Sequence, residues 1–346
     1  MIVDKNYCMS SFLMFRCIVD ENKTFADGLI PQRFIPNENR YKIKSSKDID
    51  QAIRSILKDK IDNKTGIMLS GGIDSAILAT YMPEGTKAYT LKCIADGAID
   101  ETIKAKEFAD KCNLDHRIVE VYWEDYKKLS PKLMKHKGAP IHSIEPQIYK
   151  AALQAKKDGI EKLVFGESAD AIFGGLDGLL SKDWLFDDFV NRYSYVMPNK
   201  VLKHYEIILE PYKRFQVGEY IDAYRFISEF FYLESVASYT NACSLAGVEF
   251  IAPYVEMKMD VPIDLERIRS GESKYLVREL FNKLYPNHEM GQKTPMPRPM
   301  AQWLADWDGP TRKEFISNSI EGFKGDQKWL VYVLEWFLNL LDEGSN

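Results

Sequence analysis

Short apolar runs and helical periodicity alternate along residues 46–175. Apolar residues between Ile49 and Leu57 recur three and four positions apart, which is typical of one face of a helix, and Ser46 is a plausible N-cap. The intervening runs predict four strands: "TGIMLS", "KAYTLKCI", "HRIVEVY" and "KLVFG". Strands that alternate with helices in this way predict an α/β fold, a parallel twisted sheet with helices on both faces.

Further helices are expected between and after these strands. They are Ala76–Met82, the segment "DETIKAKEFADKC" with a face of Ile103, Phe108, Ala109 and Cys112, a helix that starts at Ser130–Pro131, and one from Pro146 to Gly159. Both prolines stand at expected helix starts, a position that proline tolerates.

The segments on either side of this region have different patterns. Residues 1–45, with "YCMSSFLMFRCIV" followed by turn-rich "DGLIPQRFIPNEN", are expected to form a short β-like arm. Strand patterns fade after Gly175, so residues 176–346 are expected to be a mostly helical half that covers the α/β half. The segment "WLVYVLEWFLNLL" is too short to span a bilayer and predicts a C-terminal helix, buried in the core or in a contact of a possible homo-oligomer.

Composition narrows the possible functions. The 346 residues carry a net charge of −5, with a sequence pI of about 5.7, which argues against nucleic acid as the main partner. No secretory signal or membrane span is recognised, and the five cysteines form no C-x-x-C pair, so a reduced, cytoplasmic protein is expected. The spacing of the five histidines matches no metal site.

The stretch "GIMLSGGIDSAILATYM" breaks an apolar run at Ser70, Gly71 and Gly72, followed by Asp74 and Ser75. A glycine-rich turn between a strand and a helix presents backbone N–H groups to phosphate oxygens, and serine hydroxyls add donors. The aspartate would repel phosphate by itself, so we interpret it as a ligand for Mg²⁺ carried by a nucleotide. The sequences G-x-x-x-x-G-K-S/T and G-x-G-x-x-G are absent. The alternative is a tight turn with an ordinary helix cap.

The segment "LVFGESADAIFGG" places Glu167 and Asp170 after the fourth predicted strand. Open parallel sheets bind ligands beyond the carboxyl ends of their strands, so both acids are expected to face the same crevice as the glycine-rich turn. Asp170 would then share Mg²⁺ with Asp74, and Glu167 would orient or deprotonate a nitrogen nucleophile. The alternative is a capped helix start with solvated acids.

These two motifs resemble those of a known family. The sequence from Ser70 to Ser75 is similar to the loop of the N-type ATP pyrophosphatases, which split ATP between its α and β phosphates. The second segment is similar to the G-E-G-x-D-E-x-F-G-G signature of the asparagine synthetase family, which includes β-lactam synthetases and lasso-peptide cyclases. Here Ser168 and Ala171 replace a glycine and an acid. The resemblance covers residues 46 to 310.

Other segments extend the resemblance. They are the Asp100–Glu101 pair with the helix after it, "SLAGVEFIAPYVE", Ser273–Lys274 with Arg278, and "GQKTPMPRPMAQWL". The last of these is similar to a mobile loop of the family, which implies that Lys293 neutralises pyrophosphate and the transition state. The resemblance also implies adenosine contacts at Leu69, Leu91 and Gly166.

Some positions depart from the family pattern. Ile2 stands where full-length asparagine synthetases have the cysteine of a glutaminase domain, so no such domain is expected, and Cys8 and Cys17 are interpreted as packed thiols. Ile251 replaces a family arginine, so the acceptor need not be aspartate. Glu167 keeps the acid of the asparagine synthetases where a β-lactam-forming enzyme would have tyrosine.

The resemblance implies an ATP- and Mg²⁺-dependent ligase that adenylates a small-molecule carboxylate and then forms an amide with release of AMP. Its nitrogen would be free ammonia, ammonia from a separate glutaminase subunit, or an amine on the substrate, as in a lactam or macrolactam cyclase. Two alternatives from other classes remain. One is a tRNA-modifying ATP pyrophosphatase, for which a basic surface and paired cysteines are missing. The other is a non-catalytic nucleotide-binding scaffold, which Ala171 keeps open.

Overall fold

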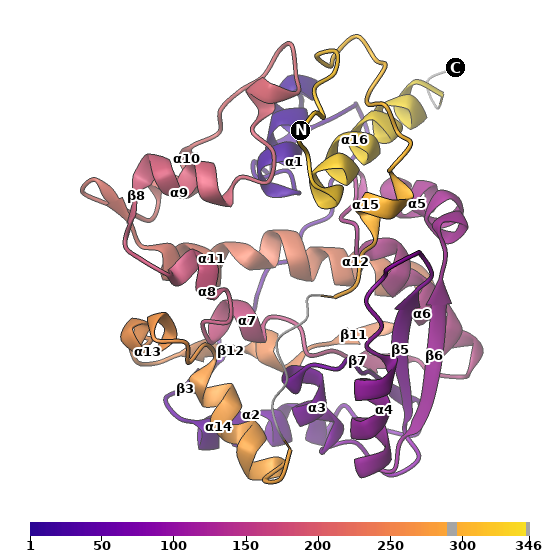
Figure 1. The fold of residues 1–346 in the computed structure, drawn as a ribbon, viewed down its shortest axis with the longest axis vertical. Helices are drawn as coiled ribbons and strands as arrows, with labels where there is room; N and C mark the ends of the chain where they lie inside the picture. Colours follow the sequence, from indigo (N-terminus) through magenta and orange to yellow (C-terminus); the bar gives the residue numbers. More distant parts are fainter. Residues whose placement is uncertain (289–295, 344–346) are drawn as a thin grey trace.

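The computed structural model describes residues 1–288 and 296–343. Its centre is a five-stranded parallel sheet in the order β11-β7-β4-β5-β6 (Figure 1). The strands are β4 (Thr65–Met68), β5 (Lys87–Cys93), β6 (Asp115–Val121), β7 (Lys162–Val164) and β11 (Glu249–Ile251). The first four are the strands that the apolar runs predict. The α/β class and the parallel sheet are therefore confirmed.

The chain changes direction across this sheet at β4. From β4 it proceeds outward through β5 to β6, then returns to place β7 on the other side of β4, with β11 beyond it. Ile67 of β4 pairs with Ala88 of β5 and with Val164 of β7, so these parallel strands end at the same edge. Such a reversal is where open α/β sheets bind ligands. Both sequence motifs follow directly after the two strands that meet there.

Helices cover both faces of the sheet, as the pattern predicts. α4 and α6 both contact β5 and β6, and Figure 1 shows them on opposite sides of these strands. The helices of the α/β half are α2 (Ser46–Lys58), α3 (Ile73–Ala79), α4 (Thr102–Lys111), α5 (Trp123–Lys137) and α6 (Glu145–Lys157).

Some local predictions within this half were wrong. The N-cap of α2 is Ser45, whose side chain accepts a hydrogen bond from the backbone of Asp48, and not Ser46. No helix starts at Ser130–Pro131, because α5 begins earlier and includes Pro131. Ile103 does not belong to the buried face of α4, since its side chain is 73% exposed in the first turn.

Residues 1–45 contain a helix where a β-like arm was expected. α1 (Lys5–Phe15) is buried from Tyr7 to Phe15 and packs against α16 (Gly325–Glu343). The strand prediction was wrong because a helix that is buried on every side has no polar face, and so loses its helical periodicity. Two parallel strand pairs involve this region: β1 (Ile2–Val3) with β2 (Lys23–Thr24), and β3 (Tyr41–Ile43) with β12 (Met257–Met259).

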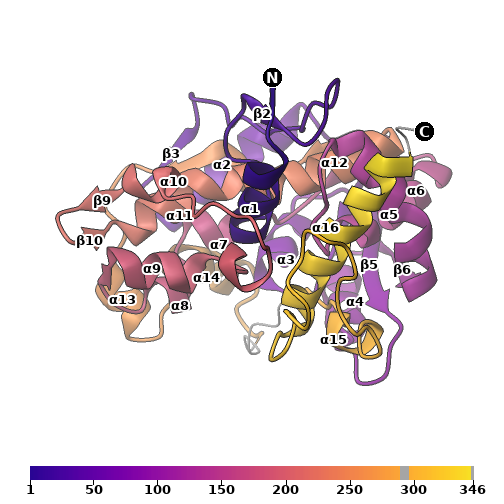
Figure 2. The same cartoon turned by 90° about the horizontal axis from the view of Figure 1, so that it is seen from above.

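The region after Gly175 is mostly helical, and Figure 2 shows it beside the α/β part. Its helices and turns, with the short α7 before it, are α7 (Ala169–Ile172), α8 (Asp177–Leu180), α9 (Phe186–Tyr193), η1 (Pro198–Lys200), α10 (Glu210–Lys213), α11 (Ala223–Phe231), the π-helical turn η2 (Tyr232–Val236), α12 (Ala237–Ala246), η3 (Pro253–Glu256), α13 (Leu265–Arg269), α14 (Tyr275–Leu284), α15 (Met300–Trp303) and α16. A small antiparallel sheet contains β8 (Trp184–Leu185), β9 (Gln216–Val217) and β10 (Tyr220–Ile221). The pattern did not predict β11.

Buried apolar residues form one continuous core through both regions. α16 contributes Trp329 and Phe337 to this core, so the prediction of a buried C-terminal helix is confirmed. Cys8 and Cys17 are buried free thiols, as expected. Of the helices formed by the described residues, none is both long enough and apolar enough to cross a lipid bilayer.

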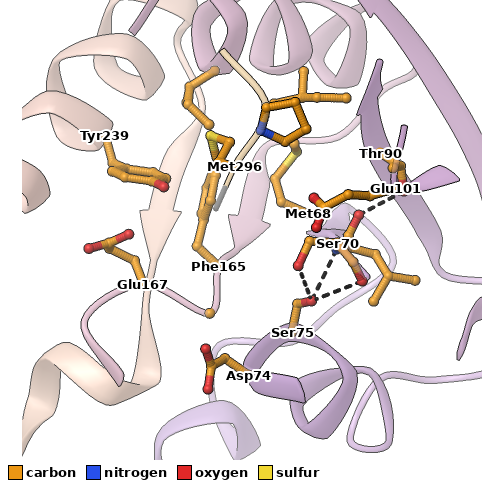
Figure 3. Close-up of a pocket in the computed structure, with 15 residues that line it drawn as sticks. Met68, Ser70, Asp74, Ser75, Thr90, Glu101, Phe165, Glu167, Tyr239 and Met296 are labelled. Carbon is orange, nitrogen blue, oxygen red and sulfur yellow. Dashed lines mark hydrogen bonds between the residues drawn. The ribbon is translucent and has the colours of Figure 1, made fainter. Parts of the chain in front are cut away.

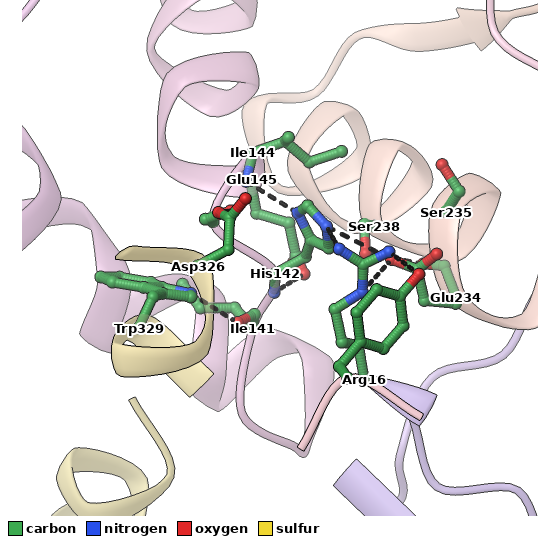
Figure 4. A network of polar contacts seen from close by, with 12 residues as sticks. Arg16, Ile141, His142, Ile144, Glu145, Glu234, Ser235, Ser238, Asp326 and Trp329 are labelled. Carbon is green, nitrogen blue, oxygen red and sulfur yellow. Dashed lines mark hydrogen bonds and ion pairs between the residues drawn. The ribbon is translucent and has the colours of Figure 1, made fainter. Parts of the chain in front are cut away.

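A buried ion pair fixes the end of α1 to the rest of the molecule (Figure 4). Arg16, the C-cap of α1, places its Nε 3.0 Å from Oε1 of Glu234 in η2. Its guanidinium group also contacts His142 and the hydroxyl of Tyr195. Glu234 is 1% exposed, so this pair lies inside the molecule and links the N-terminal segment to η2.

Candidate functional site

A cavity of about 140 Å³ lies at the carboxyl edge of the sheet, next to β4, β5 and β7 (Figure 3). Its lining residues are Met68, Leu69, Ser70, Asp74, Ser75, Thr90, Leu91, Glu101, Ile148, Phe165, Gly166, Glu167, Tyr239, Met296 and Pro297. Predicted site residues from both motifs therefore border one cavity. Gly71, Gly72 and Asp170 do not line it, and Lys293 lies outside the described residues.

The turn from Ser70 to Ser75 is held together by its two hydroxyl groups. Ser75 Oγ accepts a hydrogen bond from the Ser70 nitrogen at 3.0 Å and lies 3.0 Å from Ser70 Oγ. Ser70 Oγ in turn accepts from the Gly72 nitrogen at 3.2 Å. Gly71 approaches α4 so closely that a Cβ there would lie 2.9 Å from Cβ of Lys104. The hydroxyls thus shape the turn, and they are placed to donate to a ligand in the cavity as well.

Gly166 brings the second motif against the first. A Cβ at this position would lie 2.9 Å from the nitrogen of Ser75 and 3.1 Å from Cβ of Asp74, and real side chains do not approach a backbone that closely. Ser168, which replaces a glycine of the signature, has a φ of 75°, in the left-handed region that favours glycine. The backbone after β7 therefore requires small or glycine-like residues in order to lie beside the start of α3.

Asp74 and Asp170 converge on one cation, the ammonium group of Lys274. Its Nζ lies 2.9 and 2.7 Å from the two carboxylate oxygens of Asp74, and 2.9 Å from Oδ1 of Asp170. Burial by itself lowers the pKa of Lys274, but the charges of the two aspartates outweigh it and raise this pKa above its ordinary value. The two predicted metal ligands are thus close enough to share one positive charge.

This pair of carboxylates fits a hard divalent cation. Mg²⁺ in proteins takes one or two carboxylates, and substrate phosphates and water complete its six ligands. Within residues 1–288 and 296–343, no group of three or more His, Cys, Asp or Glu could hold a metal ion. A metal between Asp74 and Asp170 would therefore depend on oxygens that a nucleotide brings. The Tyr254 hydroxyl donates to the backbone oxygen of Asp74 at 3.2 Å and helps to fix that side of the site.

Glu167 and Tyr239 lie together on one side of the cavity, opposite the turn from Ser70 to Ser75, here called the serine turn (Figure 3). The Ser235 hydroxyl donates a hydrogen bond to its Oε1 at 2.9 Å. Burial raises the pKa of Glu167 to about 7, because the hydrogen bonds from Ser235 and Tyr239 only partly offset the desolvation of the carboxylate. Ser235 belongs to the π-helical turn η2, and such turns are frequent at functional sites. A carboxyl group with this pKa can exchange or share a proton near neutral pH.

The ends of β4 and β5 form an apolar wall of the cavity. Leu69 and Leu91 are both buried and line it, as expected for adenosine contacts, which remain a prediction. The Thr90 hydroxyl donates to the Leu69 carbonyl at 2.7 Å, and His116 Nε2 lies 2.8 Å from it on the other side. Burial lowers the pKa of His116, so a neutral ring in a structural role is the simplest interpretation of this histidine.

Sequence reasoning gave no role to Glu101, Tyr239 or Lys274. Lys274 is 200 positions from Asp74, and nothing local in its segment indicates that its side chain reaches the serine turn. Tyr239 lies in α12 among other aromatic residues that belong to the core. Only Glu101 carried a usable signal, because an acid shortly after a strand of a parallel sheet lies near the edge that binds ligands.

Known proteins resemble this chain at several levels. The family model described as asparagine synthase matches residues 47–316, which include both motifs. A protein of Methanocaldococcus jannaschii named as a glutamine-hydrolysing asparagine synthetase is 27% identical over 132 residues, or 37% of this chain. The match spans only 24% of that relative's length. NMN synthetase from Francisella tularensis aligns with 73% of this chain and 99% of its own, at 14% identity and a TM-score of 0.28, which is too low to support an argument.

Proposed function

Because this chain belongs to the asparagine synthase family, whose members use ATP, we propose that it is an amide-forming ligase that cleaves ATP to AMP and pyrophosphate. Its acceptor is a small-molecule carboxylate. Its nitrogen comes from ammonia, free or delivered by a separate glutaminase subunit, or from an amine.

In the first step, a carboxylate oxygen of the substrate attacks the α-phosphorus of ATP. The bond from that phosphorus to the oxygen that bridges to the β-phosphate breaks, and pyrophosphate leaves behind an acyl-adenylate. The hydroxyls of Ser70 and Ser75, which line the cavity, would donate hydrogen bonds to the departing pyrophosphate. The backbone N–H groups of Gly71 and Gly72 would join them once the Gly72 N–H is released from Ser70 Oγ, to which it donates in the structure. Donors that are already in place stabilise charge that develops in the transition state.

Positive charge in the site comes from two lysines and a metal ion in this proposal. Lys274 is fixed beside the serine turn, and Lys293 is assigned to the pyrophosphate by the resemblance alone. Mg²⁺, when it is bound with the nucleotide between Asp74 and Asp170, would shield the phosphate oxygens. Asp74 and Asp170, which hold the Lys274 ammonium in the structure, would be the residues that hold this cation.

In the second step, the nitrogen attacks the acyl carbon and AMP leaves, so that an amide bond forms. Glu167 is placed at the far side of the cavity from the pyrophosphate turn, where the activated acyl group would face it. Its carboxylate would accept a hydrogen bond and then a proton from the nitrogen. Ser235 and Tyr239 keep this carboxyl group in position by hydrogen bonding.

One observation carries the proposal: the carboxylates of two loops almost a hundred residues apart meet at the switch point of the sheet. Asp74 follows β4 and Asp170 follows β7, and both lie within 2.9 Å of the same ammonium group. The two loops are also tightly packed against each other, because Gly166 of the second loop lies directly against the backbone of Asp74 and Ser75.

Phosphorus NMR of a reaction with ATP, Mg²⁺, ammonium and a panel of amino and sugar acids tests the proposal. We expect AMP and pyrophosphate in equal amounts with the correct acid, and none with the Asp170→Asn variant. Turnover without ammonium would identify an amine within the substrate, and thus a cyclase. ADP and phosphate in place of AMP and pyrophosphate would overturn the proposed chemistry.

A further inference from the structure

The Glu101 side chain enters the cavity beside Met68 and Ser70 (Figure 3). It is only 9% exposed, and no hydrogen bond or ion pair joins its carboxyl group to any of the described residues. It precedes α4 as the N-cap residue, yet its side chain makes no capping hydrogen bond. The carboxyl group lines the cavity, so its oxygens can accept hydrogen bonds from a ligand that binds there.

The environment of Glu101 disfavours an isolated negative charge. Burial raises its pKa to about 7, and the charge of Lys104 lowers it only in part. The adjacent acid behaves in the opposite way: Asp100 is exposed and lies 2.8 Å from the ammonium group of Lys92. The two neighbouring acids therefore differ, since one is paired at the surface and the other faces the cavity alone.

The position of Glu101 in the cavity indicates which part of a bound nucleotide its carboxylate would contact. A Cβ on Gly71 of the serine turn would lie 3.6 Å from Cβ of Glu101. Leu91, which lies near the end of β5, lines the same cavity. Glu101 therefore lies between the proposed phosphate and adenosine contacts. A carboxylate repels phosphate oxygens but accepts hydrogen bonds from hydroxyl groups, so the ribose is the part of the nucleotide that suits it.

The topology supports the same assignment. In dinucleotide-binding sheets, an acid that follows the strand next to the glycine-rich loop binds the ribose hydroxyls. Glu101 follows β5, which is the neighbour of β4, and β4 leads into the serine turn. Glu101, β5 and the serine turn are thus arranged like the acid, strand and glycine-rich loop of dinucleotide-binding sheets, although the sequence of the serine turn differs from that of the glycine-rich loop.

We propose that Glu101 accepts hydrogen bonds from the ribose hydroxyls of the nucleotide, and that it makes the site selective for ribonucleotides over deoxyribonucleotides. The inference rests on the proposed function in one respect, that ATP occupies the cavity. It assigns to Glu101 a role in binding and specificity that is separate from the chemistry of Asp74 and Glu167.

Calorimetric titration of the full chain with ATP, 2′-deoxy-ATP and 3′-deoxy-ATP, each with Mg²⁺ at pH 8, tests this inference. We expect the wild-type protein to bind at least one deoxy analogue about ten- to a hundredfold more weakly than ATP, as for loss of a hydrogen bond to a charged group. Glu101→Ala should weaken ATP binding to the level of that analogue and leave the analogue's affinity unchanged. Glu107→Gln, an exposed acid on the same helix, is the matched control and should bind like the wild type.

Each outcome separates this inference from the proposed function. Equal wild-type affinity for the three nucleotides overturns the role of Glu101 but leaves the ligase proposal intact. An equal loss of affinity for all three in Glu101→Ala also overturns it, because that result indicates a metal ligand or a structural role. Failure of the wild type to bind ATP overturns both proposals. Thermal denaturation of each variant confirms that it is folded.

Discussion

Asp74 and Asp170 each form an ion pair with Lys274, and each is the ligand that we propose for a metal that arrives with the nucleotide. Changing either aspartate to asparagine removes one negative charge and one strong oxygen ligand. We expect Asp74→Asn and Asp170→Asn each to reduce AMP formation to below about 1% of the wild-type rate, because phosphate charge would no longer be shielded. AMP release at saturating ATP is the measurement.

A matched control for these variants is Asp188→Asn, an exposed aspartate in α9, which Figure 1 shows away from the sheet. It should retain the wild-type rate. Full activity in Asp74→Asn or in Asp170→Asn would remove the metal assignment. Loss of activity together with loss of cooperative unfolding would show only that the ion pair supports the fold.

Glu167 gives the proposed reaction a pH dependence that can be shifted. Burial raises the pKa of Glu167 to about 7, while the Ser235 hydroxyl stabilises the charged carboxylate and so lowers this pKa. If the carboxylate is the active form, kcat/KM for the nitrogen donor rises with pH through about 7. Ser235→Ala removes the donor, so the rising limb should move to higher pH.

The pH–rate profiles of the wild type and Ser235→Ala, measured with the same nitrogen donor, check this prediction. Protonation of the donor is common to both profiles and cancels in their ratio. Thr240→Ala, whose hydroxyl donates to the backbone oxygen of Val236 at the end of η2 and not to Glu167, is a suitable control and should leave the limb in place. A shift to lower pH in Ser235→Ala would contradict the assignment of Glu167 as a base.

At the scale of single residues, the sequence predicted the turn from Ser70 to Ser75 and the two acids of the second motif because each is a local pattern. The pairing of Lys274 with these acids could not be predicted, since it joins residues 200 positions apart through the packing of α14. The position of Lys293 on the nucleotide stays a prediction.

At the scale of elements, the site depends on how closely the loop after β7 approaches α3. Gly166→Ala introduces a methyl group 2.9 Å from the nitrogen of Ser75, so the two loops must separate. Because a displacement of about 1 Å can reduce catalysis about a hundredfold, we expect kcat/KM to fall by at least tenfold. Steady-state AMP formation measures this effect.

Gly178→Ala in α8 is the matched control for this change. A Cβ at Gly178 meets only a flexible arginine side chain at 3.6 Å, so this variant should be as active as the wild type. Wild-type activity in Gly166→Ala would show that the loops can separate without harm, and that their close contact is not needed for catalysis.

Four strands of the sheet were predictable because each is an apolar run between turn residues. β11 was not, because its three residues start with the charged Glu249 and are soon followed by Pro253, so no apolar run marks it. Two helices were also misread: α1 lacks a polar face, and α5 continues through Pro131. In each of these cases packing in the folded molecule outweighs the local preference.

At the scale of the whole molecule, Arg16 and Glu234 join the N-terminal segment to η2, next to the residue that binds Glu167. Arg16→Met leaves Glu234 buried without its cation. We expect the free energy of unfolding to fall by about 3–5 kcal/mol, as for other buried ion pairs that lose one partner. Urea denaturation monitored by tryptophan fluorescence measures the change.

The double variant Arg16→Met/Glu234→Leu separates charge from packing. Replacing both partners by apolar residues removes the isolated charge, so most of the lost stability should return. Equal instability of the single and double variants would contradict this explanation and would indicate that the shape of the arginine side chain matters more than its charge.

The family match also ends before the molecule does. Residues 47–316 include the sheet and both motifs, whereas α1 and α16 lie entirely outside that range. These two helices nevertheless contact each other and contribute to the same core. Neither the periodicity nor the resemblance predicted the packing of α1 against α16, because it depends on contacts between segments far apart in the sequence.

The lysine between the two aspartates has a consequence for the order in which ligands bind. Because the Lys274 ammonium already neutralises the two aspartates, a divalent ion from solution would gain little binding free energy there. We therefore expect the protein to bind the metal weakly in the absence of nucleotide. Triphosphate oxygens change this balance, since they add ligands for the metal and offer the displaced ammonium group a new anion. Metal and nucleotide would then enter together, and a half-loaded protein would be rare.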